Sequence, residues 1–129
     1  MFVHGGAQTG QRFWETPDGR EGWAQFFLRR GYGIYVVDQV ARGRSGFPYQ
    51  LYPEMSSQSL PFVLRRALGT EDGETWLWPQ AHLHTQWPGE KKPGDPVFDH
   101  NYAGAVPSME NRQPQREMNV AALGALLDR

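Results

Sequence analysis

The sequence contains no cysteine, no long apolar run and no excess of charge of either sign. Without cysteine, disulfide frameworks and thiolate metal sites are excluded. No apolar run approaches the roughly 20 residues that a membrane-spanning helix needs, and no basic-then-apolar leader precedes the first predicted strand. The 13 basic and 14 acidic residues leave a net charge of −1. We therefore expect no nucleic-acid partner bound through its phosphates, and no membrane partner.

Glycine, proline and aromatic residues are abundant in the chain. Its 129 residues include 15 glycines and 10 prolines, and 13% of them are aromatic. The aromatic side chains provide material for a core, whereas glycine and proline favour turns. A chain of this length is long enough for one domain, so the composition predicts a compact but loop-rich domain.

The first 46 residues are typical of a β-loop-α-β unit. Met1–Val3 is a short apolar run, and residues 4–22 form a loop rich in glycine, threonine and proline. Apolar residues then follow a helical spacing over Trp23–Arg30, and Ile34–Asp38 begins with an apolar run typical of a strand buried on both faces. This order predicts an α/β arrangement of two neighbouring parallel strands, with the helix packed on one face.

Residues 47–107 contain most of the prolines and few clear secondary-structure patterns. We expect little regular structure there, apart from a short helix over Leu60–Gly69. A segment this long without clear elements is typical of a lid or binding insertion, and we expect it to lie over the carboxyl ends of the strands. Its aromatic side chains would form apolar pocket walls. They are Trp76, Trp78, Trp87, Phe98 and Tyr102.

Residues 108–129 end with a helical pattern. Pro114 suits the first turn of a helix, and apolar residues recur at helical spacing as far as Arg129. We expect the helix Pro114–Arg129 to cover part of the sheet. Its apolar stripe consists of Met118, Ala121, Ala122, Ala125 and Leu126.

The sequence HGG at residues 4–6 follows directly after the first predicted strand. Glycines let the chain turn sharply and leave backbone N–H groups free to face a developing negative charge. An ordinary glycine turn is the alternative. Gly5 and Gly10 also have the spacing of a phosphate-binding loop, but Gln11-Arg12 follow where that loop needs Lys and Ser or Thr, so this third interpretation is disfavoured.

The loop after Asp38 is rich in glycine and arginine. It follows the carboxyl end of a predicted parallel strand, where ligands gather in α/β folds. Ser45 in the sequence GRSGF does not match the G-x-S-x-G nucleophile elbow, because Phe47 occupies the last position. We therefore interpret Ser45 as a structural hydroxyl.

The histidines of the middle segment include residue types that bind metals. His82, His84 and the pair Asp99-His100 are the candidates. Histidines two apart on an extended segment are weak evidence for a metal site, however, and we expect no metal and no other cofactor. His84 is interpreted as a residue that anchors its loop by hydrogen bonding.

Three longer motifs are specific. The chain contains HGGAQTG, TPDGREGW and YVVDQVARGRS, followed later by WPQAHLHTQWPG, GDPVFDHNYAGAVP and the closing ALGALLDR. These stretches resemble a group of bacterial and fungal carboxylesterases in the α/β-hydrolase superfamily, which has the patterns H-G-G-x-x-T-G, T-P-D-G-R-x-G-W and Y-V-V-D-Q-x-x-R-G-R-S. The resemblance covers nearly the whole chain. One departure is Val40-Ala41, where the group usually has a small turn that contains glycine.

The resemblance implies a partial α/β-hydrolase fold. Residues 1–46 would provide the oxyanion loop and the βαβ unit, residues 47–107 the lid and residues 108–129 the C-terminal helix. It also implies hydrolysis of a small-molecule carboxylic ester by a serine that a histidine and a carboxylate activate. In such enzymes two strands precede the HGG strand, and the nucleophile strand follows the helix ending in LLDR. We therefore expect an internal portion of a larger enzyme that is inactive alone.

The resemblance also implies roles for individual residues. The backbone N–H of Gly6 would supply half of the oxyanion hole, and Gly5 and Ala7 would shape the turn. His4 and Trp87 would line the substrate pocket with them.

Two other functions stay open. One is an α/β-hydrolase-fold protein with dehalogenase, epoxide hydrolase or thioesterase chemistry, or with a non-catalytic binding role. The other is an unrelated metal-binding or ligand-binding protein. By default we expect a cytoplasmic location, unless a segment before Met1 directs export.

Overall fold

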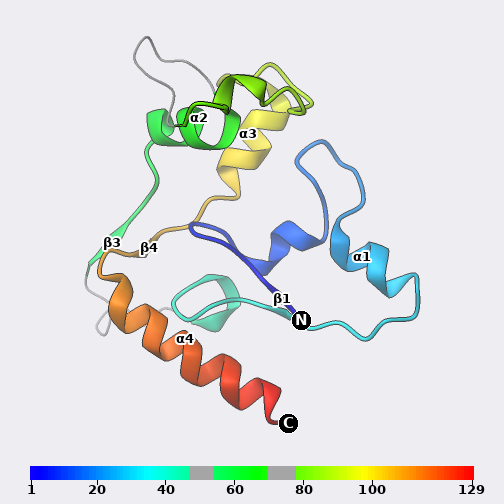
Figure 1. The fold of residues 1–129 in the computed structure, drawn as a ribbon, viewed down its shortest axis with the longest axis vertical. Coiled ribbons are helices and arrows are strands. Elements are labelled where there is room, and N and C mark those ends of the chain that lie inside the picture. The colour runs from blue at the N-terminus through cyan, green and yellow to red at the C-terminus, as the bar shows by residue number, and fades with distance from the viewer. Residues whose placement is uncertain (47–53, 70–77) are drawn as a thin grey trace.

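The computed structural model describes residues 1–46, 54–69 and 78–129. Within these residues it combines short strands with α-helices and 3-10 helices, which confirms a mixed α/β class. In chain order the elements are β1 (Phe2–Val3), η1 (Gly10–Phe13), α1 (Trp23–Leu28), β2 (Val36–Val37), η2 (Gly43–Ser45), β3 (Met55–Ser56), α2 (Leu60–Leu68), η3 (Ala81–Leu83), α3 (Pro96–Ala103), β4 (Ser108–Met109) and α4 (Arg112–Leu127). Figure 1 shows β1 near the centre, α1 to its right, α2 and α3 together at the top, and α4 at the bottom.

β1 and β2 form a parallel pair, as the β-loop-α-β pattern predicts. Phe2 lies opposite Val36, and the Phe2 N–H donates to the carbonyl of Tyr35 at 2.7 Å. Both strands are shorter than the predicted runs, because only two residues of each pair in the ladder. Since parallel strands end at the same edge of a sheet, the loops after β1 and β2 lie side by side.

α1 begins after Gly22 and ends at Leu28, earlier than predicted. Gly31, with a φ of +81°, stops the helix. Its N–H donates to the Leu28 carbonyl at 2.9 Å, and the Tyr32 N–H donates to the Phe27 carbonyl at 3.2 Å. These two bonds make a Schellman motif, in which glycine adopts the left-handed conformation at little cost.

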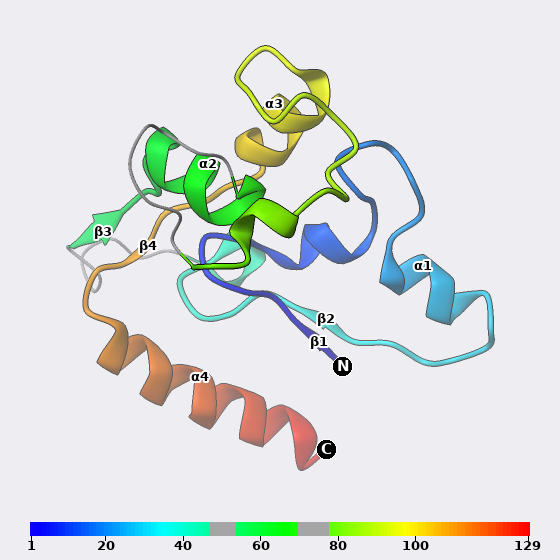
Figure 2. The same ribbon diagram turned by 45° about the horizontal axis from the view of Figure 1, so that its top comes forward.

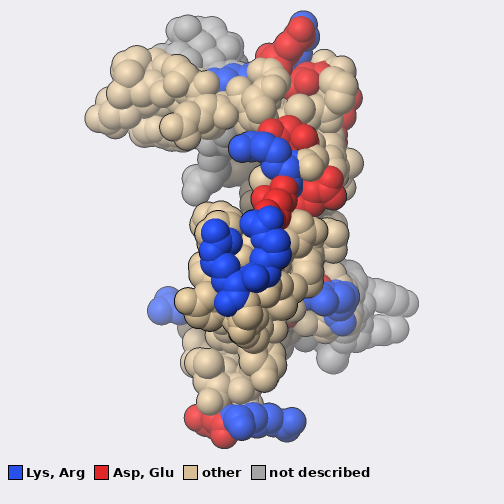
Figure 3. Space-filling model, turned by 90° about the vertical axis from the view of Figure 1, so that its right-hand side faces the viewer, with Lys and Arg blue, Asp and Glu red and all other residues tan. Residues whose placement is uncertain are grey.

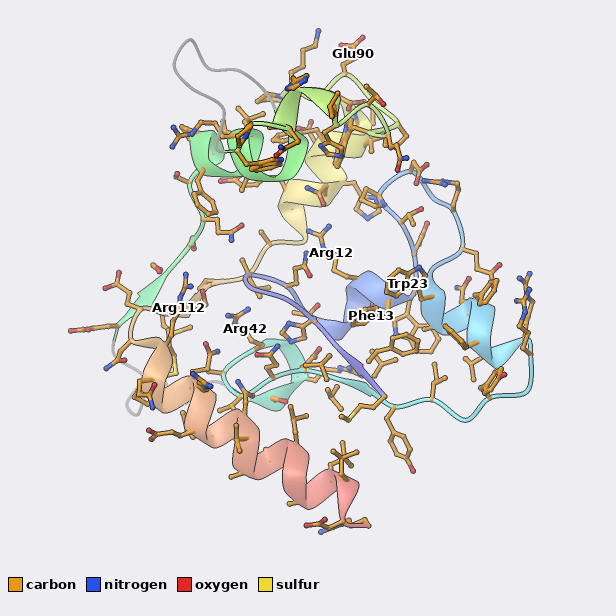
Figure 4. All side chains as sticks on the ribbon, in the orientation of Figure 1. Arg12, Phe13, Trp23, Arg42, Glu90 and Arg112 are labelled. Atoms are coloured by element: carbon orange, nitrogen blue, oxygen red, sulfur yellow. The ribbon has the colours of Figure 1, made fainter. Side chains whose placement is uncertain are left out.

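An aromatic cluster joins α1 to β1 and η1. The ring centroids of Phe2 and Phe13 are 5.0 Å apart, and those of Phe2 and Phe27 are 5.8 Å apart. Trp23 stacks on Phe13 at 6.4 Å (Figure 4). Aromatic pairs at these separations stabilise packing beyond the area that they bury. The cluster connects α1 to β1 and η1, whereas the packing of α1 on one face of the sheet stays a prediction.

The loop predicted over residues 4–22 contains a helical turn, η1, that the sequence pattern did not indicate. The Thr9 side chain caps this turn by accepting the Gln11 N–H at 3.4 Å. Gly10 packs so closely on β2 that a Cβ atom would lie 2.7 Å from Cγ1 of Val36. Tertiary packing, more than local propensity, therefore places η1 against β2.

The described part of residues 47–107 contains more regular structure than predicted, so the expectation is wrong for that part. α2 confirms the short helix over Leu60–Gly69. α3 was not expected, although Asp95-Pro96 is a local start signal. The Asp95 side chain accepts the Val97 N–H at 3.3 Å, and proline suits the first turn. β3 pairs antiparallel with β4, which forms a second small sheet.

α2 and α3 pack around Phe98, which is 1% exposed. Val63 of α2 is buried with it. The partly buried residues packed on this pair are Leu60, Leu64, Trp87 and Tyr102. The aromatic residues of the middle segment thus form a core of their own. Of the others, Trp78 is 36% exposed, and Trp76 lies outside the described residues.

α4 begins at Arg112, slightly before the predicted Pro114, because the Asn111 side chain accepts the Gln113 N–H at 3.1 Å and caps the helix. It runs beside the strand pair (Figure 2). We expected this helix to cover part of the sheet. The second half of α4 faces β2 across a cavity of about 320 Å³, so its apolar stripe does not pack tightly on the strands. The exposed members of the stripe are Ala121, Ala122 and Ala125.

Acidic and basic side chains are interspersed on the side of the molecule where α1 lies (Figure 3). Arg20 pairs with Asp18 at 2.6 Å, and Arg29 pairs with Glu21 at 2.8 Å. Both arginines are mostly exposed, so solvent screens these pairs and they add little to stability. None of the helices in the described segments is long and apolar enough to cross a membrane.

Candidate active site

The turn after β1 contains the predicted oxyanion-loop residues, His4 to Ala7. His4 and Ala7 are both 3% exposed, whereas Gly5 and Gly6 are exposed. Ala7 has a φ of +53°, a conformation that costs a residue with a Cβ atom about 1 kcal/mol. Its carbonyl accepts the Val106 N–H at 3.0 Å. Burial and this hydrogen bond hold the turn in a shape that the local preference of alanine opposes.

Gly6 presents a free backbone donor. Its N–H makes no hydrogen bond to any described residue, whereas the Gly5 N–H donates to Oε1 of Gln8 at 3.3 Å. Gly6 lines a cavity of about 810 Å³. A backbone N–H at a cavity wall, with no hydrogen-bond acceptor of its own, can donate to a bound substrate and stabilise the negative charge that develops there.

The His4 imidazole joins the ends of β1 and β2. Its Nδ1–H donates to the Gly5 carbonyl at 2.9 Å, and its Nε2 accepts the Gln39 N–H at 3.0 Å. The Gln39 side chain donates back to the His4 carbonyl, and Asn119 of α4 donates to that side chain at 3.2 Å. Both ring bonds require the neutral tautomer with its proton on Nδ1. His4 therefore supports the turn from behind and does not line the cavity at Gly6.

Burial lowers the pKa of His4. The hydrogen bond to the Gly5 carbonyl and the charge of Asp38 act in the opposite direction, and the charge of Arg42 reinforces burial. Because the folded protein holds His4 neutral more strongly than the unfolded chain does, its contribution to stability is present above about pH 6.5 and is lost as the pH falls.

We expect the free energy of unfolding to decrease from about pH 7 to about pH 5, and to decrease less in His4→Gln. Denaturant unfolding at both pH values measures this difference. Equal pH dependence in the wild type and His4→Gln would contradict the neutral His4.

Asp38 organises the loop after β2. Its side chain is 3% exposed. Oδ1 accepts the Gly10 N–H at 2.5 Å, and Oδ2 accepts the backbone N–H of Arg44 at 2.8 Å and its Nε–H at 2.9 Å. Burial alone would raise the pKa of Asp38, but the hydrogen bonds from Arg44 and Gly10 lower it to about 2. The ionised carboxylate therefore ties η1 to η2.

The same loop contains Ser45 and Val40-Ala41. Ser45 lies in η2, and its hydroxyl donates to the Asp38 carbonyl, as expected for a structural hydroxyl. Ala41 is 2% exposed and has a φ of +60°. A left-handed conformation favours glycine, which gives a physical reason for the glycine that the resembling group usually has in this turn.

The end of the predicted lid contacts the turn through polar groups. Arg12 of η1 donates through both terminal nitrogens to Asn101 of α3, one to its side chain and one to its carbonyl (Figure 4). The bond between Val106 and Ala7 lies next to this contact. Residues 96–106 are therefore fastened to the HGG turn.

The cavity at Gly6 is surrounded by the loops after β1 and β2, the segment from β3 to α2, and the start of α4. Its lining is mostly polar. Representative lining residues are Gln39, Arg42, Ser57, Phe62, Arg112 and Gln115. Trp87, expected in the substrate pocket, does not line this cavity but packs on Val63 and Phe98.

The candidate metal-binding residues of the middle segment do not lie together at one site. Among the described residues, no group of three or more His, Asp or Glu is placed to hold a metal ion. Nδ1 of His100 lies 3.0 Å from the Pro17 carbonyl. His84 makes a hydrogen bond within its loop through its backbone carbonyl, which accepts from Nζ of Lys91.

Sequence reasoning missed the polar residues that attach α4 to the loop after β2. The Val40 N–H donates to Oδ1 of Asn119 at 2.8 Å, and Nε2 of Gln115 donates to the Val40 carbonyl at 3.1 Å. Gln115 is 7% exposed. Asn119 has a sequence signal, because a polar residue next to the apolar stripe of a helix indicates a buried polar contact.

Comparison with known proteins indicates the class of chemistry. Over its whole length, the chain is 47% identical across 136 aligned residues to a probable secreted lipase, phiG, of a fungal species (strain ATCC 74256). It spans 34% of that lipase. No family model and no solved structure matches the chain. The similarity supports a hydrolase of the lipase or esterase type and is consistent with a chain that corresponds to part of one.

Proposed function

We propose that this chain forms the oxyanion-loop region of a serine hydrolase with the α/β-hydrolase fold, which cleaves small-molecule carboxylic esters. The observation that best supports this role is the unengaged Gly6 N–H at the wall of the 810 Å³ cavity. The 47% identity to a probable secreted lipase supports the ester class.

In the proposed mechanism, the Gly6 N–H donates to the carbonyl oxygen of the ester. Attack on the carbonyl carbon by a serine moves negative charge onto this oxygen, so the hydrogen bond strengthens in the transition state. The His4–Gln39 bonds hold the turn in place before substrate arrives. A preorganised donor stabilises the oxyanion without reorganisation during the reaction.

The attacking serine is proposed to lie outside this chain. None of its five serines, all of them within the described residues, lies in a strand-turn-helix elbow. Ser45 bonds to the Asp38 carbonyl, and Ser59 caps α2 by accepting the Phe62 N–H at 3.4 Å. We therefore expect the chain to supply part of an active site that other segments complete.

The test compares two proteins in hydrolysis of p-nitrophenyl butyrate. For the chain alone, the wild type and Ser45→Ala should hydrolyse the ester at the same background rate. A hybrid lipase, in which this chain replaces the matching third of the fungal lipase, should hydrolyse the ester and lose activity with a serine-directed phosphonate. A rate of the chain alone that disappears in Ser45→Ala, or an inactive but folded hybrid, would contradict the proposal.

A further inference from the structure

The cavity beside Gly6 has an uncompensated positive lining. Three arginines face it, and none of the described residues that line it is an aspartate or glutamate. The arginines come from two elements, because Arg42 follows β2 while Arg112 and Arg116 lie in the first two turns of α4. Figure 4 shows Arg42 and Arg112 close together between the turn after β1 and the start of α4.

Arg42 is the unusual member of this set. It is 5% exposed, yet its guanidinium pairs with no carboxylate among the described residues. The only hydrogen bond that the Arg42 side chain makes within those residues is a long one of 3.5 Å to the Gln8 carbonyl, and its Nε–H has no acceptor among them. Burying a charge without a partner is costly, and buried guanidinium groups are normally paired. Within the described residues, Arg42 therefore has no carboxylate partner, and a ligand with an anionic group can supply one.

Arg112 adds a second positive charge beside Arg42. Burial lowers the pKa of Arg42, and the positive charge of Arg112 lowers it further, so the two groups lie close enough to repel each other. A bound carboxylate would relieve this repulsion and accept hydrogen bonds from both guanidinium groups. The remaining lining consists mainly of serine hydroxyls and of side-chain amides such as Gln39 and Gln58, which suit a polar ligand.

We propose that the cavity binds a carboxylate through Arg42 and Arg112, and that the natural ester substrate therefore has a free carboxylate in addition to its scissile ester group. This proposal rests on the proposed function, since it places the ester carbonyl at the Gly6 N–H and the carboxylate across the same cavity. Half-esters of dicarboxylic acids have this chemistry.

The binding test uses the chain itself and does not depend on turnover. Isothermal calorimetry and thermal melting are measured with monomethyl succinate, with the neutral dimethyl succinate and with inorganic phosphate. We expect monomethyl succinate to bind and to raise the melting temperature, and dimethyl succinate to do neither. Binding should weaken at least about tenfold in Arg42→Gln and in Arg112→Gln, because each loses charge-assisted hydrogen bonds.

The matched control is Arg129→Gln, which removes the same charge beyond the far end of α4 and should bind as the wild type does. Arg112 and Arg129 are both exposed, so Arg112→Gln keeps the test valid if Arg42→Gln fails to fold. Equal binding of the neutral diester, unchanged binding in both cavity variants, or tighter binding of phosphate would overturn the proposal.

The hybrid lipase separates this inference from the proposed function. We expect a higher kcat/KM for monomethyl succinate than for methyl butyrate, with the preference lost in Arg42→Gln. Hydrolysis of both esters without that preference would overturn the carboxylate site and leave the proposed function intact. Carboxylate binding by the chain without any hydrolysis by the hybrid would overturn the proposed function alone.

Discussion

Replacing Gly6 by proline in the hybrid lipase should lower kcat/KM for p-nitrophenyl butyrate about 100-fold or more, because loss of one oxyanion donor typically has an effect of this size. Proline lacks the backbone N–H, and the Gly6 N–H is a donor of this turn that no described group engages. The measurement is initial-rate kinetics on the purified variant and its parent. Circular dichroism and thermal melting establish that both proteins are folded.

Gly6→Ala is the control that separates the N–H from the shape of the turn. Alanine keeps the donor, no heavy atom lies within 4 Å of where its Cβ would be, and the φ of Gly6 lies outside the left-handed range. We therefore expect Gly6→Ala to retain most of the parent activity. Equal activities of Gly6→Pro and the parent, or equal losses in Gly6→Pro and Gly6→Ala, would contradict the role of this N–H.

The second large effect is expected at Gly43, in the loop after β2. Replacement by alanine should reduce the free energy of unfolding of the chain by about 3 kcal/mol, the sum of left-handed strain and overpacking. Gly43 has a φ of +46°, and its Cβ would lie 2.5 Å from Oδ2 of Asp38 and 3.0 Å from Cγ2 of Thr9. Relief of the contact would require Asp38 to move away from Gly10 and Arg44.

Gly31 provides the matched comparison, because it isolates the strain from the clash. Its φ is +81°, and no described heavy atom outside its own chain neighbours lies within 4 Å of a Cβ built there. We expect Gly31→Ala to reduce the free energy of unfolding by only about 1 kcal/mol. Urea unfolding of both variants gives the two values. A Gly43→Ala variant as stable as Gly31→Ala would show that Asp38 does not hold this loop.

Much of the local structure was predictable from short-range patterns. The apolar runs around Phe2 and Val36 predicted a parallel strand pair, and the periodicity after Trp23 predicted α1. These predictions succeeded because strand and helix preferences depend on neighbouring residues. α3 was missed although Asp95-Pro96 is a helix start, because proline-rich surroundings concealed the signal.

The candidate site was predictable only in part. The HGG turn follows β1 as the motif suggested, and the Gly6 N–H is unengaged among the described residues. The burial of Trp87 with Phe98, away from the cavity, was not predictable. An aromatic residue has the same sequence signature whether it packs in a core or lines a pocket, because both environments are apolar.

The sequence by itself determined the order of strand and helix in residues 1–46, the short helix α2 and the position of the HGG turn after β1. Only the tertiary structure decided that His4 is a neutral support for that turn and that Arg42 is buried with no carboxylate partner among the described residues. The physical reason is the distance along the sequence over which each interaction acts. Caps and periodicity act between residues a few positions apart, whereas burial and charge compensation depend on groups that only the fold brings together.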